Sequence, residues 1–324
     1  MDLRQLAALT AVADHHSFSA AARALHTVQS NVSTHVARLE REVGASLVDR
    51  ASGQLTEAGE IVVVRARRVQ AELEALTADV ASSLGEISGQ VRLGIIGTTG
   101  RWLVPGLLAE MARSHPKVRL ITVDATTTSL VPQLAAGRLD LAVVNLPVAD
   151  PDVEVRGLFD EDHVVLVPAA HALADKERLS LVDLTDIPVL LEPVGTGFRD
   201  DLDADAALAG VTLVPQAEVD GMRLLASLAY QGYGAAILPA SAIVEWADGT
   251  ALVIPLDGTR PRSVGLATRR RAQLPAPARA TVDIIHKVVS ADVPTRPGLH
   301  LTLAGGRADH SSASAMSKPG GPSK

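Results

Sequence analysis

One long, uninterrupted helical pattern divides this 324-residue chain into two parts of different character. The segment TEAGEIVVVRARRVQAELEALTADVASSL, residues 56–84, has no internal proline, and Thr56 is placed to cap its N-terminus. Its apolar residues recur at alternating steps of four and three, the heptad spacing of helices that pair with a partner helix. A core helix packed only on its own chain is the alternative. We predict a dimerisation helix over residues 57–84 with a seam of Val62, Ala66, Val69, Leu73, Leu76 and Val80.

The segment before this helix has the pattern of three short amphipathic helices followed by a small wing. Ser19 is placed to cap the second helix. In the third helix, Val32, Val36 and Leu39 fall on one face, so the polar residues between them point the other way. Gly44 is predicted to end this helix. The segments SLVDR and QLT flank the turn ASG and predict two very short strands.

The segment after the long helix alternates short apolar strands with helices. It begins with GEISGQ, residues 85–90, which is predicted to be a hinge. The strands are continuous apolar runs, which indicates mainly parallel sheets covered by helices on both faces. One large sheet and two smaller sheets with a cleft between them both fit this pattern. The predicted strands cover residues 91–96, 118–124, 139–145, 163–168, 187–193, 212–219, 234–239 and 263–268.

The composition excludes several classes of protein and site. The chain has no cysteine, which rules out disulfides, thiolate metal sites and thiol-based redox sensing. Aromatic residues make up only 2%, so a stacking platform for single-stranded nucleic acid is not expected. The N-terminus lacks the pattern of a signal peptide, and no apolar run reaches the length of a membrane span. We therefore expect a soluble cytoplasmic protein without a membrane partner.

The net charge argues against bulk attraction to nucleic acid. The chain has a formal net charge of −7, and its first 60 residues hold five arginines against seven acidic residues. If this segment binds DNA, the placement of its few cations must matter more than their number.

Sequence patterns of catalytic and metal sites are absent. The chain has neither the G-x-S-x-G pattern of a nucleophile elbow nor the H-E-x-x-H pattern of a zinc site. GIIGTTGR follows a predicted strand but lacks the glycine spacing of a dinucleotide site and the lysine of a phosphate loop. DLDADAALAGVT alternates acids, yet it has Ala206 and Thr212 where a calcium loop needs glycine and glutamate. We therefore predict no catalytic residues, no metal and no cofactor.

The order of helix, turn, helix, wing, long helix and α/β body resembles that of LysR-type transcriptional regulators. At the N-terminus the resemblance is carried by LRQL, SFSAAARALH, Gln29 with Ser33 four residues later, RLE, LVDR and LTEAG, in the family's order and spacing. In the body it is carried by HPKVRL, LAAGRLDLAVV and LAYQGYGAAILP. Together these motifs extend over residues 1–290 or so of the chain.

The resemblance implies an α/β fold with an N-terminal winged helix-turn-helix, a long dimerisation helix and a two-lobed α/β effector-binding domain similar to type 2 periplasmic binding proteins. The first lobe is expected at about residues 91–165 plus 269–291, and the second at about 166–268. Small, polar and turn-forming residues dominate the C-terminus, which predicts a disordered tail. The expected parts are 1–60 (DNA-binding domain), 57–84 (linker and dimerisation helix), 85–90 (hinge), 91–291 (effector-binding domain) and 292–324 (tail).

The implied function is sequence-specific regulation of transcription, modulated by a small-molecule effector bound between the lobes. Implied partners are double-stranded DNA, a second copy in a homodimer, further copies in a homotetramer, the effector, and RNA polymerase as a candidate. Two alternatives remain: a solute-binding module without a DNA function, and an α/β enzyme. The first leaves the N-terminal helices unexplained, and the second needs a catalytic constellation that the sequence does not offer.

In such regulators the third helix enters the major groove, so its polar face supplies the expected DNA contacts. Gln29 suits bidentate pairing with adenine, and Arg38 and Arg50 suit phosphates. The family usually has serine and proline beside the glutamine, but this chain has Val28 and Ser30, so Thr27 is expected to cap the helix. The predicted DNA-binding residues are Gln29, Ser30, Asn31, Ser33, Thr34, His35, Arg38, Arg50 and Ser52.

The expected effector contacts lie in loops that begin helices after strands, where backbone N–H groups converge. Their hydroxyls and amides suit a small anion or another polar metabolite, and helix capping alone is the alternative. Arg101 and Arg199 lie near these loops in the sequence and are candidates to supply charge. The predicted effector-binding residues are Thr98, Thr99, Gly100, Thr126, Thr127, Thr128, Asn145, Thr196 and Phe198.

Overall fold

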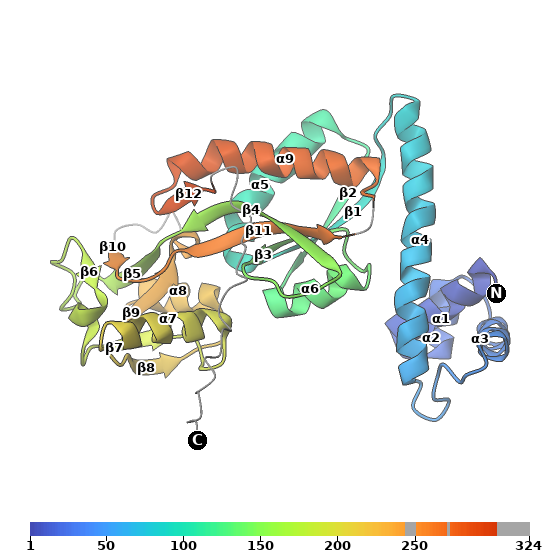
Figure 1. The fold of residues 1–324 in the computed structure, drawn as a ribbon, viewed down its shortest axis with the longest axis horizontal. Helices are drawn as coiled ribbons and strands as arrows, with labels where there is room; N and C mark the ends of the chain where they lie inside the picture. Colours follow the sequence, from blue (N-terminus) through green and yellow to red (C-terminus); the bar gives the residue numbers. More distant parts are fainter. Residues whose placement is uncertain (244–250, 271–272, 303–324) are drawn as a thin grey trace, which may run out of the picture.

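The structure is a computed structural model and describes residues 1–243, 251–270 and 273–302. One long helix, α4 (Glu57–Ser83), carries a small helical unit along one side and the α/β body along the other (Figure 1). The backbone N–H of Gly59 donates to Thr56 Oγ1 at 3.0 Å, which confirms the predicted cap of this helix. Gly59 also allows a close approach, because a Cβ there would lie 2.0 Å from the carbonyl oxygen of Leu47.

The helical unit consists of α1 (Leu3–His15), α2 (Phe18–Ala24) and α3 (Gln29–Val43). The predicted two-stranded wing is reduced to an isolated antiparallel bridge between Val48 and Leu55. The apolar face predicted for α3 is buried and packs against α1, the wing and the first turns of α4. The buried core of the unit includes Leu9, Val12, Val32, Val36, Leu39, Leu47, Val63 and Ala66.

The N-caps of α2 and α3 differ from the sequence prediction. Ser17, rather than Ser19, caps α2 with its side chain. Val28, rather than Thr27, occupies the N-cap of α3 and makes no side-chain capping bond. Both predicted caps were wrong because the helix starts were misplaced: α2 begins at Phe18, two residues earlier than a cap at Ser19 requires, and α3 begins at Gln29, one residue later than a cap at Thr27 requires. Gly44 ends α3 as predicted, in the left-handed conformation with φ of 79°.

The first lobe of the body is a six-stranded sheet in the order β12-β4-β11-β3-β1-β2. β1 (Gly89–Ile95), β2 (Val118–Asp124) and β3 (Leu141–Asn145) are parallel, whereas β4 (Val153–Glu161) and β11 (Arg262–Arg269) pair antiparallel. α5 (Gly97–Ser114) and α9 (Ala276–Asp292) cover one face, and α6 (Thr127–Ala135) covers the other (Figure 1). The carboxyl ends of the parallel strands meet at the edge where α5 and α6 begin.

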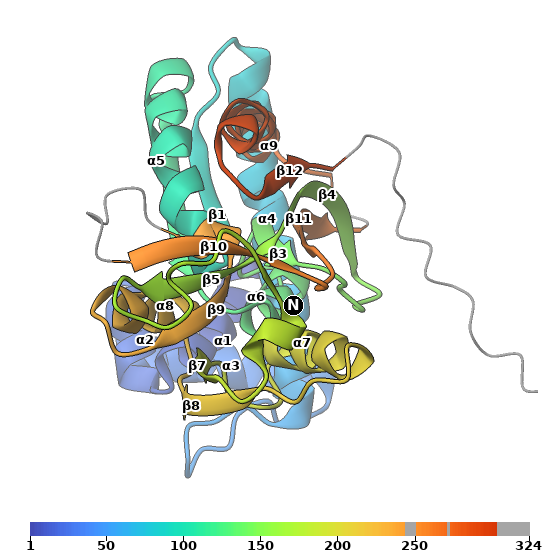
Figure 2. The ribbon, with the colours of Figure 1, turned by 90° about the vertical axis from the view of Figure 1, so that its left-hand side faces the viewer.

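The second lobe is a six-stranded sheet in the order β6-β10-β5-β9-β7-β8, seen from the side in Figure 2. Its helices are α7 (Gly197–Leu208) and α8 (Met222–Tyr230), with the short 3-10 helices η1 (Leu181–Leu184) and η2 (Ala240–Ala242). The strands are β5 (His163–Pro168), β6 (Leu179–Ser180), β7 (Pro188–Leu191), β8 (Val214–Glu218), β9 (Ala235–Pro239) and β10 (Ala251–Asp257).

Two sheets are therefore present, and their type and boundaries correct the sequence prediction. Both sheets are mixed rather than mainly parallel, because β11 and β12 in the first sheet and β5 in the second run opposite to the other strands and pair with their neighbours antiparallel. The chain enters the second lobe at Asp162 and leaves it just before β11. The predicted lobe boundaries at 165 and 269 were thus misplaced, since β11 pairs with β3 and β4 of the first lobe.

The described part of the predicted disordered tail is ordered. After α9 the chain forms η3 (Val293–Thr295) and β12 (Leu299–Leu301), and β12 pairs antiparallel with β4. Val293 and Leu299 are buried in the hydrophobic core. Because both ends of the segment between them are buried, the residues between them have a defined position. The rest of the predicted tail, residues 303–324, lies outside the described residues.

Candidate DNA interface and effector site

The outward face of α3 carries short hydrogen-bonding side chains. Gln29, Ser30, Asn31, Thr34 and Arg38 are exposed, while the opposite face is buried in the helical core. Their local hydrogen bonds are exposed ones: Ser19 Oγ donates to Gln29 Oε1 at 2.9 Å, and Thr34 Oγ1 donates to the carbonyl oxygen of Ser30 at 2.8 Å. Such contacts contribute little net stability in water, so a base edge or phosphate can replace them.

Ser33 and His35 are less accessible than the other predicted DNA contacts. Both side chains are half-buried. His35 lies close enough to Asp2, the N-cap of α1, for the two side chains to interact electrostatically, and its Nδ1 is buried without a hydrogen-bond partner. His35 therefore lies near the start of α1, at the margin of the exposed face.

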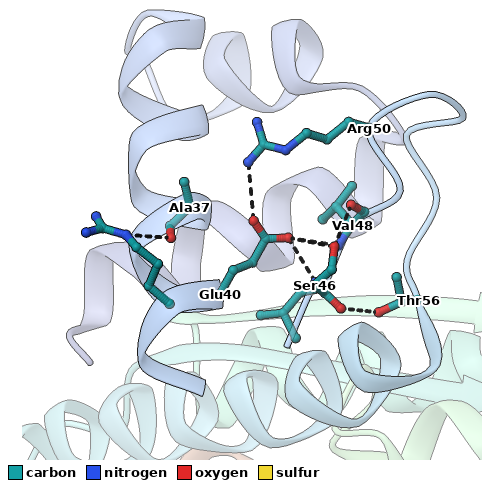
Figure 3. Close-up of polar contacts among 8 residues, drawn as sticks. Ala37, Glu40, Ser46, Val48, Arg50 and Thr56 are labelled. Carbon is teal, nitrogen blue, oxygen red and sulfur yellow. Dashed lines mark hydrogen bonds and ion pairs between the residues drawn. The ribbon is translucent and has the colours of Figure 1, made fainter. Parts of the chain in front are cut away.

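Glu40, which was not among the residues predicted from the sequence, connects the wing to α3 through hydrogen bonds (Figure 3). Its Oε1 accepts hydrogen bonds from the backbone N–H of Leu47 at 2.9 Å and of Val48 at 3.3 Å. Its Oε2 accepts one from Arg50 Nη2 at 3.2 Å. Burial alone would raise the pKa of Glu40, but these hydrogen bonds outweigh it and hold the pKa below its ordinary value.

Arg50 and Ser52 bring the wing to the same surface. The side chain of Arg50 remains 56% exposed while it is paired with Glu40, so it can contact a phosphate from a fixed position. Ser52 is exposed at the turn of the wing, where its Oγ accepts a hydrogen bond from the backbone N–H of Gln54 at 3.3 Å. The wing thus presents one oriented cation beside α3.

The predicted threonines of the first lobe meet at the carboxyl edge of its sheet. Thr127 Oγ1, at the start of α6, accepts a hydrogen bond from the backbone N–H of Asn145 at 2.9 Å. The hydroxyls of Thr126 and Thr128 lie 3.0 Å apart. Thr99 Oγ1 and Asn145 Oδ1 are buried without a hydrogen-bond partner. Because buried polar atoms are normally paired, these two atoms mark a place where a bound molecule can supply the missing hydrogen bonds.

Gly100 shapes the first turn of α5 beside this cluster. A Cβ at this position would lie 3.2 Å from Cγ2 of Ile95 at the end of β1. Glycine therefore lets the start of α5 pack closely on the strand that precedes it, which fixes the position of Thr98 and Thr99.

The predicted residues of the second lobe lie at the start of α7. Thr196 caps this helix, accepting a hydrogen bond from the backbone N–H of Arg199 at 3.4 Å. The Phe198 ring lies 5.1 Å from the ring of His163, which begins β5 where the chain enters this lobe. Within the described residues, neither Thr196 nor Phe198 hydrogen-bonds the threonines of the first lobe. The two predicted sets therefore stay on separate lobes.

An ion pair at the junction of the lobes was not predicted from the sequence. Glu161, at the end of β4, is fully buried and accepts hydrogen bonds from Arg262 Nε at 2.7 Å and from the backbone N–H of Ser241 at 2.9 Å. Arg262 Nη2 also donates to Thr98 Oγ1 at 2.9 Å. This pair therefore joins β4, β11, η2 and α5, and it links a predicted effector residue to both lobes.

A second ion pair spans the lobes above the start of α5. Arg223 Nη1 of α8 lies 2.5 Å from Asp124 Oδ2 at the end of β2. A Cβ on Gly97 would lie 2.9 Å from Asp124 Oδ1 and 3.2 Å from Arg223 Nε, so the pair sits directly over the helix start. The nearby Arg101 donates to the carbonyl oxygen of Ala242 at 3.4 Å.

Arg199 and His163 add no free charge at the junction of the lobes. Arg199, a candidate from the sequence, is buried and pairs with Asp203 and Glu218, both at 2.8 Å, so its charge is committed within the second lobe. Burial, and then the positive charge of Arg262, lower the pKa of His163, whose Nδ1 is buried without a partner. His163 is therefore a neutral imidazole at neutral pH.

The predicted seam of α4 divides into two parts. Val62 and Ala66 pack against the helical unit of the same chain. Val69, Leu73, Leu76 and Val80 have exposed fractions of 41%, 42%, 62% and 55%, which leaves an apolar stripe open along the distal half of the helix. Exposed apolar patches rimmed by polar residues commonly mark protein–protein contact sites.

The described residues contain no group of His, Asp and Glu side chains arranged to hold a metal ion. None of their helices combines the length and the apolar character needed to cross a membrane.

A helix-turn-helix unit joined through a long helix to a two-lobed α/β domain defines a DNA-binding transcriptional regulator with an effector-binding domain. The sequence model "Bacterial regulatory helix-turn-helix protein, lysR family" matches residues 3–60, and "LysR substrate binding domain" matches residues 84–290. The chain belongs to the LysR family of transcriptional regulators.

Similar proteins include regulators named for hydrogen peroxide. The chain is 34% identical over 246 residues to a "Probable hydrogen peroxide-inducible genes activator" of Streptomyces viridosporus, covering 74% of this chain and 78% of the relative. It is 30% identical over 296 residues to the "DNA-binding transcriptional dual regulator OxyR" of Escherichia coli K12, covering 87% and 96%.

Solved structures of full-length regulators share the fold. An OxyR variant of Pseudomonas aeruginosa has 26% identity and a TM-score of 0.70, covering 89% of this chain and 94% of that one. CbnR in complex with its target DNA has 25% identity and a TM-score of 0.64, covering 89% and 100%.

Proposed function

We propose that this regulator reads a defined DNA sequence by placing α3 in the major groove. The observation that carries the proposal is the division of α3: Val32, Val36 and Leu39 anchor it in the core, and that anchoring aims its hydrogen-bonding side chains outward. Gln29 and Ser33 are assigned to base edges, and Arg38 and Arg50 to phosphates. Ser30, Asn31, Thr34 and Ser52 lie on the same surface and His35 at its margin, as supporting contacts.

The functional unit in this proposal is a homodimer joined through α4. The exposed stripe of Val69, Leu73, Leu76 and Val80 is the proposed interface, and two recognition helices then meet two half-sites of an interrupted palindrome. Dimers pair further into tetramers, and RNA polymerase is a proposed partner at the promoter. Because its target is chromosomal DNA, the proposed location is the cytoplasm.

The effector is proposed to bind between the lobes, against Asn145, Thr196, Phe198 and the threonine cluster, which consists of Thr98, Thr99, Thr126, Thr127 and Thr128. The supporting observation is the pair of buried, unpartnered atoms Thr99 Oγ1 and Asn145 Oδ1. Arg262 and Arg223 already have carboxylate partners, so recognition falls mainly to uncharged hydrogen-bonding groups. We infer a polar effector and a regulatory rather than catalytic role for the site.

Several relatives are named for a response to hydrogen peroxide. We infer that this chain does not sense peroxide by oxidation of a cysteine. One of the solved OxyR structures is a cysteine-to-aspartate variant, and another has cysteine replaced by serine. This chain contains no cysteine, so it has no thiolate for a peroxide to oxidise. Its effector is therefore proposed to bind reversibly by hydrogen bonds.

A gel-shift experiment tests the DNA proposal. The DNA upstream of the protein's own gene is titrated with the wild type and with a Gln29→Ala, Ser33→Ala double variant at about 150 mM salt. We expect the wild type to select this DNA over a scrambled duplex and the double variant to lose the preference while keeping weak general binding. Equal, sequence-indifferent binding by both proteins would remove specific reading by α3.

A further inference from the structure

α6 connects the two functional regions of the chain. At its N-terminus Thr127 Oγ1 accepts the hydrogen bond from Asn145 within the proposed effector cluster. At its C-terminus the carbonyl oxygen of Ala135 accepts a hydrogen bond at 2.9 Å from Nη2 of Arg68, which belongs to α4. The helix has nine residues and so spans about 13 Å between these contacts. In Figure 1, α6 lies on the edge of the body that faces α4.

Arg68 attaches α4 to the first lobe at two points. Besides the helix end, its Nη2 donates to Asp152 Oδ2 at 2.7 Å, in the loop that precedes β4. A cation is favoured at a helix C-terminus, where the last carbonyl groups carry partial negative charge. The turn after α6 is close to the same side chain, since a Cβ on Gly137 would lie 3.8 Å from Arg68 Cγ. A displacement of α6 therefore has to move Arg68 or break its contacts.

The residue before Arg68 attaches α4 to the DNA-binding unit. Arg67 is buried and forms an ion pair with Asp14 near the end of α1. Arg138, in the turn after α6, is part of the same neighbourhood: burial and then repulsion by Arg67 lower its pKa, while Asp14 opposes the change. Arg68 and Arg67 are consecutive residues of α4. The first thus contacts the effector-binding domain, and the second contacts the DNA-binding unit.

From this geometry we propose that α6 carries the effector signal to the DNA-binding unit through Arg68 and Arg67, in addition to any movement at the hinge. The inference rests on the proposed function, because it assigns the route of that regulation. An effector bound at the threonine cluster displaces the start of α6, and a packed helix passes the displacement to its other end rather than absorbing it. Arg68 is a positioning residue in this route: it contacts neither effector nor DNA.

A double-mutant cycle on the full-length chain tests the route without knowledge of the effector. Thr127→Val perturbs the effector end of α6, and Arg68→Ala cuts the contact at the other end. Hydrogen–deuterium exchange is read at α1 and at residues 60–72 of α4. We expect Thr127→Val to change exchange there by about fivefold, within the usual range of coupling between sites, and to have less than about a twofold effect when Arg68→Ala is present.

Matched variants separate coupling from general damage. Thr127→Ser keeps the hydroxyl and should behave as the wild type, and Arg65→Ala removes an exposed arginine of the same helix and should leave the Thr127→Val effect intact. Since coupling is reciprocal, Arg68→Ala alone should also change exchange at residues 126–131, a measurement that needs no change at Thr127.

The outcomes are distinct. No response of α1 and α4 to Thr127→Val, or the same response with and without Arg68, would overturn the route through α6. If the wild type failed to bind DNA selectively, the proposed function would fail, yet the exchange measurements would still decide whether α6 couples the two units.

Discussion

Removal of the Glu161 carboxylate should lower the free energy of unfolding, because its partners and its burial are all defined in the structure. Glu161 is 0% exposed and Arg262 is 11% exposed, so Glu161→Ala leaves a guanidinium almost out of water with no counter-charge. The carboxylate accepts hydrogen bonds from Arg262 Nε and Nη2 and from the backbone N–H of Ser241. Breaking a buried pair by removing one partner costs about 3–5 kcal/mol. For a body of this size, that loss lowers the melting temperature by roughly 6–20 °C.

The assay is urea and thermal unfolding followed by tryptophan fluorescence, since Trp102 is buried in the first lobe. Glu154→Ala, on the same strand, is the matched control, because its pair with Arg156 is exposed and is expected to contribute at most about 1 kcal/mol. Replacing both Glu161 and Arg262 by Met should recover most of the loss, since no unpaired charge remains. A loss below about 1 kcal/mol for Glu161→Ala, or a double variant no more stable than the single one, would refute this reasoning.

Arg50→Ala should reduce the slope of log K against log salt by about 0.9 per protomer in DNA titrations, and an unchanged slope would show that Arg50 makes no phosphate contact. Leu73→Glu should convert the dimer to monomer in light scattering at micromolar concentration, since it places a charge on the exposed stripe of α4; a stable dimer would move the interface elsewhere. Because folding lowers the pKa of His163, the unfolded chain binds its proton more readily below about pH 6.5, so stability should fall as pH decreases through that value. His163→Gln should flatten this dependence in urea titrations at several pH values, and a fall equal to that of the wild type would exclude His163 as its source.

The sequence predicted well those features that depend on local spacing. The buried face of α3, the cap at Thr56 and the end at Gly44 follow from periodicity and backbone preference within a few residues. The apolar runs 118–124 and 163–168 coincide with β2 and β5. By contrast β4 was missed, because Glu154, Arg156 and Asp160 interrupt its apolar pattern while it pairs on both sides.

The features that the sequence did not reveal depend on residues far apart in the chain. Glu161 and Arg262 are 101 residues apart, and neither stands in a motif that marks the other. The assignment of β11 to the first lobe likewise depends on its pairing with β3 and β4. The candidate effector residues at the starts of α5 and α6 could be predicted because they stand in hydroxyl-rich loops. The ion pairs around them could not be predicted, because their partners come together only in the folded chain.

Sequence-specific DNA binding is tested most directly by the ratio of specific to non-specific DNA affinity. Fluorescence anisotropy at about 150 mM salt compares the wild type on a duplex from upstream of its own gene and on a scrambled duplex of the same composition. We expect at least about a thousand-fold preference for the first duplex, and a shallow salt dependence on the second because the surface that contacts DNA holds few cations. Equal affinities, or steep salt dependence on the scrambled duplex, would contradict sequence-specific reading by a surface with few cations.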